Sequence, residues 1–139
     1  LRKCGGEVEL TCVDLTTLEP FSPSEAGAAR LRILQQDVFD PALPLEGPYE
    51  LVLSDMAPST TGTHSVDAAR SAELVRAAAR IAVSKLRAGG ALVAKLLQGG
   101  ELPALLAELR SLFPEVKSFK PQSSRSHSTE LFIVARKGA

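Results

Sequence analysis

Three aspartates stand where strands of a parallel sheet would end. Asp14 and Asp55 come directly after short apolar runs, and Asp37 comes shortly after another. Ligands bind to open parallel sheets beyond the carboxyl ends of the strands, where a carboxylate can accept hydrogen bonds from a ribose diol or an adenine amine. The alternative is that the aspartates cap helices or close turns, as aspartate commonly does. For Asp14 and Asp37 the sequence leaves both interpretations open.

A lysine interrupts an otherwise apolar strand. Lys95 lies within Ala91–Leu97, and a lysine is costly to bury unless it is paired. It would reach the same sheet edge as Asp55, to form an ion pair or to have its pKa shifted for chemistry. Alternatively, its stem runs along apolar surface and leaves the ammonium in solvent. Glu130, at the start of the final strand, is a third candidate, or else a solvated residue at a strand edge.

Apolar patterns along the chain alternate between strands and helices. Helical spacing of apolar residues predicts one helix from Val66 to Leu86, stopped by Gly89-Gly90, and another over Leu102–Phe113, stopped by Pro114. The predicted strands are Val8–Val13, Leu31–Leu34, Tyr49–Ser54, Ala91–Leu97, Val116–Phe119 and Glu130–Ala135.

This alternation predicts an α/β fold with a mostly parallel sheet and helices on both faces. With 139 residues, 45% of them hydrophobic, the chain can form one compact domain over residues 1–139.

Three segments, in consistent order and spacing, resemble the FtsJ/RrmJ-type ribose 2′-O-methyltransferases. They are Ser54-Asp55-Met56-Ala57-Pro58, then Val93-Ala94-Lys95, then residues 120–130 with their serines, Arg125 and Glu130. The resemblance covers essentially the whole chain. The combination of three motifs is far more specific than any one of them.

The resemblance implies a Rossmann-like fold that uses S-adenosyl-L-methionine to methylate a ribose 2′-hydroxyl of RNA. In bacterial members the target is a uridine of large-subunit ribosomal RNA. By this resemblance Asp55, Lys95 and Glu130 are catalytic: Lys95 contacts the 2′-hydroxyl, to orient it or to take its proton, and the two acids hold the lysine. Asp14 matches the acid at the cofactor ribose and Asp37 the acid near its adenine, and Asp55 is also expected at the cofactor.

One part of the family pattern is not found in these 139 residues. Family members begin with a helix that carries a first catalytic lysine, then a central strand and a glycine-rich loop against the cofactor's methionine. We therefore expect a chain truncated at its N-terminus, which binds the cofactor weakly. The strand in question lies between those that end at Asp14 and Asp55. We expect the sheet either to rearrange and close this gap or to fill it with another chain.

Charge is balanced overall but unevenly divided. Residues 1–84 carry 7 basic and 12 acidic side chains, whereas residues 85–139 carry 9 and 4. An anionic partner such as RNA would meet the C-terminal part, unless the distribution is due to chance. Lys120, Arg125 and Arg136 are candidate phosphate contacts.

The remaining composition predicts a cytoplasmic protein that binds neither membrane nor metal. No apolar run approaches the roughly 20 residues of a membrane span, and no signal peptide opens the chain. The two cysteines, Cys4 and Cys12, have no metal-ligand spacing.

Two other classes of function remain open. The chain would serve as a catalytically inactive, methyltransferase-like module that binds RNA. Alternatively, it is an α/β domain of the response-regulator kind, with Asp55 as a phosphorylation site. That interpretation gives no role to the serine-rich loop or to Glu130.

Overall fold

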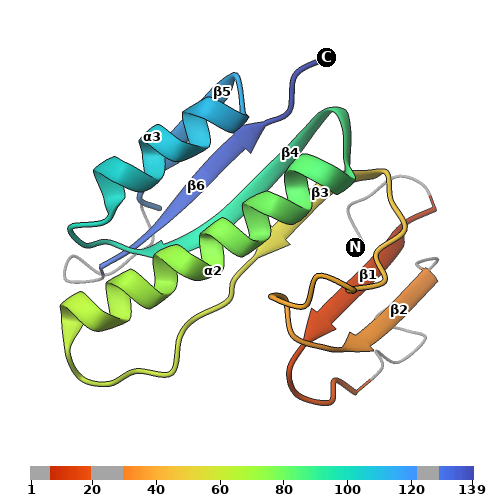
Figure 1. Cartoon of the computed structure of the whole chain (residues 1–139). Coiled ribbons are helices and arrows are strands. Elements are labelled where there is room, and N and C mark those ends of the chain that lie inside the picture. The colour runs from red at the N-terminus through yellow and green to blue at the C-terminus, as the bar shows by residue number, and fades with distance from the viewer. Residues whose placement is uncertain (1–6, 20–29, 122–128) are drawn as a thin grey trace. The chain divides into compact units, whose positions relative to one another are not determined.

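The structure is a computed structural model that describes residues 7–19, 30–121 and 129–139. The chain forms two compact units, Leu1–Leu45 and Glu46–Ala139, and each is described by itself. Figure 1 shows the elements of both units.

The first unit contains a pair of parallel strands, β1 (Glu9–Asp14) and β2 (Arg30–Gln35). Both lie within a residue of the apolar runs that predict them. Their register aligns Asp14 with Gln35, so the two strands end at the same edge. Asp37 follows β2 at this edge.

The second unit is built on a four-stranded sheet of order β3-β4-β6-β5. Its strands are β3 (Tyr49–Ser54), β4 (Leu86–Leu97), β5 (Glu115–Phe119) and β6 (Glu130–Arg136). β3 and β4 are parallel, but β6 is antiparallel to both of its neighbours. Three of the four strands, β3, β4 and β5, thus run in the same direction, as predicted for a mostly parallel sheet, and only β6 is reversed.

Two helices cover one face of this sheet (Figure 1). They are α2 (His64–Lys85) and α3 (Leu102–Leu112), and both lie close to the predicted bounds. Proline is favoured at the start of α3 because its fixed φ suits the first turn. The helices share one core with alternate residues of β4 and β6: Ala72, Val75, Ala78, Ala79, Ala82, Leu105, Leu109, Leu92, Ala94, Leu96, Leu131, Ile133 and Ala135.

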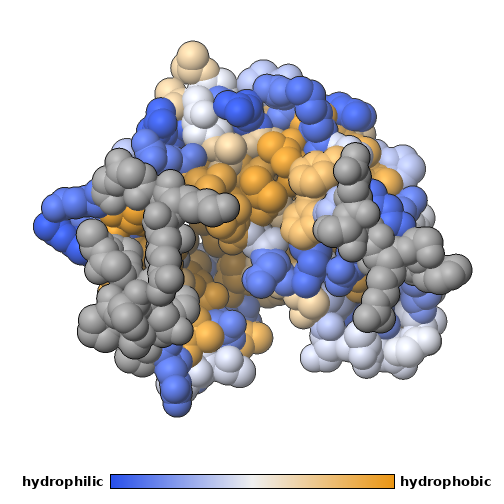
Figure 2. Space-filling view, turned by 180° about the vertical axis from the view of Figure 1, so that it is seen from behind, coloured by the Kyte–Doolittle hydropathy of each residue, from blue (hydrophilic) through white to orange (hydrophobic). Residues whose placement is uncertain are grey.

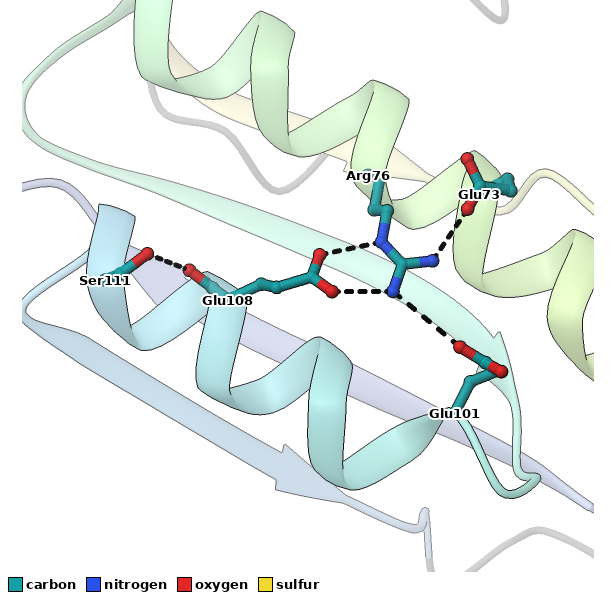
Figure 3. A network of polar contacts seen from close by, with 5 residues as sticks. All are labelled: Glu73, Arg76, Glu101, Glu108 and Ser111. Atoms are coloured by element: carbon teal, nitrogen blue, oxygen red, sulfur yellow. Dashed lines mark hydrogen bonds and ion pairs between the residues drawn. The ribbon is translucent and has the colours of Figure 1, made fainter.

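An arginine on α2 ties the two helices together at their surface (Figure 3). The guanidinium of Arg76 donates two hydrogen bonds to the carboxylate of Glu108 on α3, at 2.7 and 2.8 Å, and a third to Glu73 at 2.7 Å. Glu101, just before α3, lies 3.8 Å from the same guanidinium. Hydrogen bonding to Arg76 holds the pKa of Glu108 below its usual range, so the pair stays charged.

The start of β4 differs from the sequence expectation. Gly89 and Gly90 predict a turn between helix and strand, but α2 ends at Lys85 and β4 begins at once, at Leu86. Gly89 has a φ of +72°, a left-handed conformation that favours glycine. A Cβ on Gly90 would lie 3.1 Å from the carbonyl oxygen of Glu50. The glycines thus form an irregular first part of the strand, which sequence alone does not distinguish from a turn.

The other face of the four-stranded sheet carries apolar side chains that no described helix covers, although helices are expected on both faces. Leu51 and Leu53 of β3 are 48% and 69% exposed, and Phe119 stacks on Phe132 with ring centroids 5.9 Å apart. The view from behind shows that apolar side chains are exposed on this side (Figure 2).

The α/β class is confirmed. Among the described strands β1 pairs only with β2, and β3 pairs only with β4. Whether the gap is closed by a rearranged sheet or filled by another chain stays a prediction.

Candidate active site

Asp55 and Lys95 occupy neighbouring positions at the carboxyl ends of β3 and β4. The two strands are parallel, and Ser54, the last residue of β3, is aligned with Ala94. The next residue along each chain is Asp55 on one side and Lys95 on the other. The register therefore brings together two residues 40 positions apart in the sequence. Asp55 is exposed and Lys95 is half-buried.

Glu130 reaches the same edge from the opposite direction. β6 runs antiparallel to β4, with Phe132 opposite Lys95 and Glu130 opposite Leu97. Opposed residues, and residues two apart on one strand, share a face of the sheet. Lys95 and Glu130 thus lie on the same face, opposite the one that the helices cover.

The strand register places the backbone of all three candidates at one sheet edge, but the side chains of Asp55 and Lys95 are not bonded to each other. In the part of the chain that the structure describes, neither side chain has a hydrogen bond or an ion pair. The ion pair between them, one of the alternatives that the sequence left open, is thus not formed. The arrangement presents an ammonium donor and carboxylate acceptors at one sheet edge. Such a set can bind and orient an incoming hydroxyl group.

Two residues in the first turns of α2, Asp67 and Ser71, hold the loop after β3 and the end of β4. The sequence analysis did not single out either residue. Asp67 is 7% exposed and Ser71 is 1% exposed. Asp67 accepts hydrogen bonds from the backbone N–H and the hydroxyl of Thr61, both at 2.8 Å. These bonds, the backbone one foremost, lower the pKa of Asp67. Ser71 accepts a hydrogen bond at 3.0 Å from the N–H of Leu97.

A sequence signal existed for Asp67 alone. An acid in the first turn of a helix that follows a threonine-rich loop is typical of a residue that ties the loop down. Ser71 gives no comparable signal, because its partner lies 26 residues away on a strand.

Asp14 and Asp37 both serve as turn acceptors in the first unit. Oδ1 of Asp14 accepts from the N–H and the hydroxyl of Thr16, both at 2.8 Å. These bonds, with the backbone one foremost, lower the pKa of Asp14. Oδ1 of Asp37 accepts from the N–H of Phe39 at 2.9 Å. The turn role that the sequence left open is thus present. Both acids stand at the carboxyl edge of their strand pair.

The structure separates the basic residues predicted to contact RNA. Lys120 follows β5, whose last residue Phe119 is opposite Phe132, so it lies at the same sheet edge as Glu130. Arg136 ends β6 at the other edge, exposed, with its Nε 3.8 Å from Glu115. Arg125 lies outside the described residues.

The described residues contain neither a membrane-spanning helix nor a cluster of metal ligands. No helix in residues 7–19, 30–121 or 129–139 is long and apolar enough to cross a membrane. In the same ranges, no group of three or more His, Cys, Asp or Glu side chains is placed to hold a metal ion.

The fold is that of methyltransferases of known structure. A crystal structure from Plasmodium falciparum, described as a ribosomal RNA methyltransferase, matches 93% of this chain and 71% of its own, with a TM-score of 0.73 and 18% identity. The N-methyltransferase NodS from Bradyrhizobium japonicum, bound to S-adenosyl-L-homocysteine, matches 94% of this chain and 67% of its own, with a TM-score of 0.58 and 15% identity. These likenesses place the chain in the methyltransferase fold class.

The sequence defines the family within that class. Residues 1–138 match the model of the FtsJ-like methyltransferases, and the chain belongs to this family. It is 41% identical to ribosomal RNA large subunit methyltransferase E of Caulobacter sp. (strain K31), over 94% of this chain and 57% of the relative. It is 38% identical to the protein of that name from Oleidesulfovibrio alaskensis, over 95% of this chain and 64% of the relative. The chain thus spans about three fifths of the length of these relatives.

Proposed function

We propose that the protein transfers a methyl group from S-adenosyl-L-methionine to a ribose 2′-hydroxyl of large-subunit ribosomal RNA, at a uridine. The observation that carries the proposal is the register that sets Asp55 beside Lys95, with Glu130 on the same face as Lys95, in a chain of the FtsJ-like family. The names of its relatives support ribosomal RNA as the substrate. Such a substrate locates the activity in the cytoplasm.

The first unit offers acceptors that suit the cofactor. Asp14 and Asp37 stand at the carboxyl edge of parallel strands, where a ribose diol and an adenine amine need acceptors. The hydrogen bonds from Thr16 favour the ionised form of Asp14, and a carboxylate accepts hydrogen bonds more strongly than a carboxylic acid. When bound, the cofactor supplies a methyl group on a positively charged sulfonium. After the transfer the rest of the cofactor is a neutral thioether.

Lys95 is the residue that acts on the acceptor. Its ammonium donates a hydrogen bond to the 2′-oxygen and fixes its direction of attack; in the neutral form its amine takes the hydroxyl proton. Asp55 and Glu130 keep the lysine at the edge by charge, and Asp55 also faces the cofactor. Lys120 holds a phosphate of the RNA at the same edge.

A methyl-transfer assay tests the proposal. The full-length protein is incubated with radiolabelled cofactor and large ribosomal subunits that lack the modification. The expected product is an alkali-resistant dinucleotide, because a methylated 2′-oxygen cannot attack the neighbouring phosphate. Label in a base, or no label at all, would contradict the proposal.

The same assay separates the enzyme from an inactive RNA-binding module. Binding of the RNA without methyl transfer, at saturating cofactor, would favour the module. Membership of the FtsJ-like family leaves no support for a response-regulator-like phosphorylation site at Asp55.

A further inference from the structure

We propose that Asp67 and Ser71, one turn apart on α2, are positioning residues for Asp55 and Lys95. The inference rests on the proposed function, because it concerns the geometry in which those two residues meet the acceptor hydroxyl. Neither Asp67 nor Ser71 touches the substrate. Each holds one of the two segments that carry the catalytic pair.

Ser71 takes the place of a strand partner just beyond Lys95. Successive N–H groups of a strand point to opposite neighbours. Gln98 donates to the carbonyl of Thr129, on the β6 side, at 2.8 Å. The N–H of Leu97 therefore points toward β3, but β3 has ended at Ser54. The hydroxyl of Ser71 accepts this N–H at 3.0 Å and so fixes the strand two residues after Lys95.

Asp67 fixes the loop that follows Asp55. Its Oδ1 binds both the N–H and the hydroxyl of Thr61, six residues after Asp55. Arg70, on the same turn of α2, adds a bond at 3.5 Å to the carbonyl of Ser59. The loop is thus held at two points by one turn of helix.

Close packing strengthens the link between α2 and the end of β4. A Cβ added to Gly99 would collide with the Cβ of Ala68. Any larger residue at Gly99 would push this turn away from the helix. Ala68 lies between Asp67 and Ser71 in the sequence, so four residues of the first two turns, Asp67, Ala68, Arg70 and Ser71, hold both sides of the edge.

Simple helix capping does not account for these bonds. Thr61 lies before the helix, and the N-cap residue Thr63 makes no side-chain cap of its own. A serine inside a helix commonly bonds back to the carbonyl four residues earlier, yet Ser71 accepts from a strand. The body of α2 is anchored in the core through Ala72, Val75 and Ala79. The helix therefore serves as a fixed frame for Asp55 and Lys95.

The experiment compares Ser71→Ala with Ser84→Ala in the full-length protein. Ser84 lies on the same helix, but its hydroxyl bonds to Ile81 within α2. A displacement of a catalytic group by about 1 Å can lower the rate up to about a hundredfold. A smaller displacement of Lys95 should lower it about tenfold. We expect kcat to fall about tenfold in Ser71→Ala, with the KM for the cofactor within about twofold, and Ser84→Ala to match the wild type.

A second pair of variants distinguishes a loss of positioning from misfolding. Asp67→Asn keeps the acceptor oxygen for Thr61, whereas Asp67→Ala removes it. We expect Asp67→Asn to retain most of kcat and Asp67→Ala to lose about tenfold. If kcat is unchanged in Ser71→Ala and Asp67→Ala, or falls in them only as far as in Ser84→Ala, the positioning role is wrong.

A readout that needs no activity separates this inference from the proposed function. The side-chain NMR signal of Lys95 should shift in Ser71→Ala and stay in place in Ser84→Ala. A wild-type protein that transfers no methyl group overturns the proposed function alone. A Lys95 signal that is the same in Ser71→Ala and the wild type overturns the positioning role.

Discussion

At the scale of single residues, the proposed chemistry depends on an ammonium that lies next to a carboxylate without being bonded to it. Ala94 and Leu96 point into the core, so Lys95 points to the opposite face of the sheet. A bonded pair would hold the lysine but leave it fewer donors for a hydroxyl. Among the described residues none binds the ammonium, so in this part of the chain it can meet a substrate, which is what a residue acting on an acceptor needs.

Lys95→Ala should abolish methyl transfer and spare cofactor binding. The lysine acts on the acceptor hydroxyl, so kcat should fall by about 10² or more, while calorimetry shows nearly unchanged affinity for the cofactor. Lys85→Ala is a matched control, because Lys85 is also half-buried but ends α2. Turnover near the wild-type value in Lys95→Ala would contradict the assigned role.

Asp14→Ala should have the opposite effect. Loss of a charged acceptor for the cofactor ribose should weaken cofactor binding roughly tenfold or more. Asp40→Ala is the control, because Asp40 also accepts a turn hydrogen bond, from the N–H of Ala42 at 2.8 Å, but does not end a strand. Calorimetric titration measures both. Equal affinities in the two variants would show that Asp14 is only a turn residue.

At the scale of elements, the sequence predicts the bounds of the strands well but predicts poorly which strands pair and in which direction. Tyr49–Ser54 has the predicted bounds because its apolar run is flanked by clear turn signals. The hydrogen bond between Ser71 and Leu97 could not be predicted from the sequence, because it forms only where β4 extends past the end of β3. The direction of β6 depends on the pairing of whole strands. Asp55, Lys95 and Glu130 were found through motifs, whereas their placement at one edge is a property of the register.

Arg76 provides a prediction about how the helices are held together. Arg76→Lys keeps the charge but loses the paired hydrogen bonds to Glu108, so it should destabilise the protein by about 1 kcal/mol at pH 7. Because the pKa of Glu108 is lowered in the folded state, its contribution is present above the unfolded pKa of about 4.3 and is lost as the pH falls through the folded value.

The difference in the free energy of unfolding between Arg76→Lys and the wild type should therefore become smaller in acid. Urea unfolding at pH 7 and near pH 3 measures it. Arg80→Lys, one turn further along α2 at an exposed position, should be neutral at both pH values. A difference that is as large at pH 3 as at pH 7 would mean that packing of the arginine stem, rather than its ion pairs, accounts for the loss.

At the scale of the whole molecule, the four-stranded sheet has one well-packed face and one that no described helix covers. α2 and α3 share the first face with a continuous core. The second face presents Leu51, Leu53 and Phe119, each about half exposed or more. β3 adds an outer edge, since its only partner among the described strands is β4. Exposed strand edges flanked by apolar side chains favour pairing with another chain.

The 139-residue chain studied alone should therefore self-associate, as expected if another chain fills the gap beside β3. Leu53→Lys should shift the chain toward monomer, because a charged side chain at the centre of the contact would have to be desolvated. Leu112→Lys is the matched control: Leu112 is 51% exposed, compared with 69% for Leu53, but it lies on α3. Sedimentation velocity over a tenfold range of concentration measures the effect. A chain that stays monomeric throughout, or one in which Leu112→Lys disrupts association as much as Leu53→Lys, would show that this strand and face do not recruit a partner.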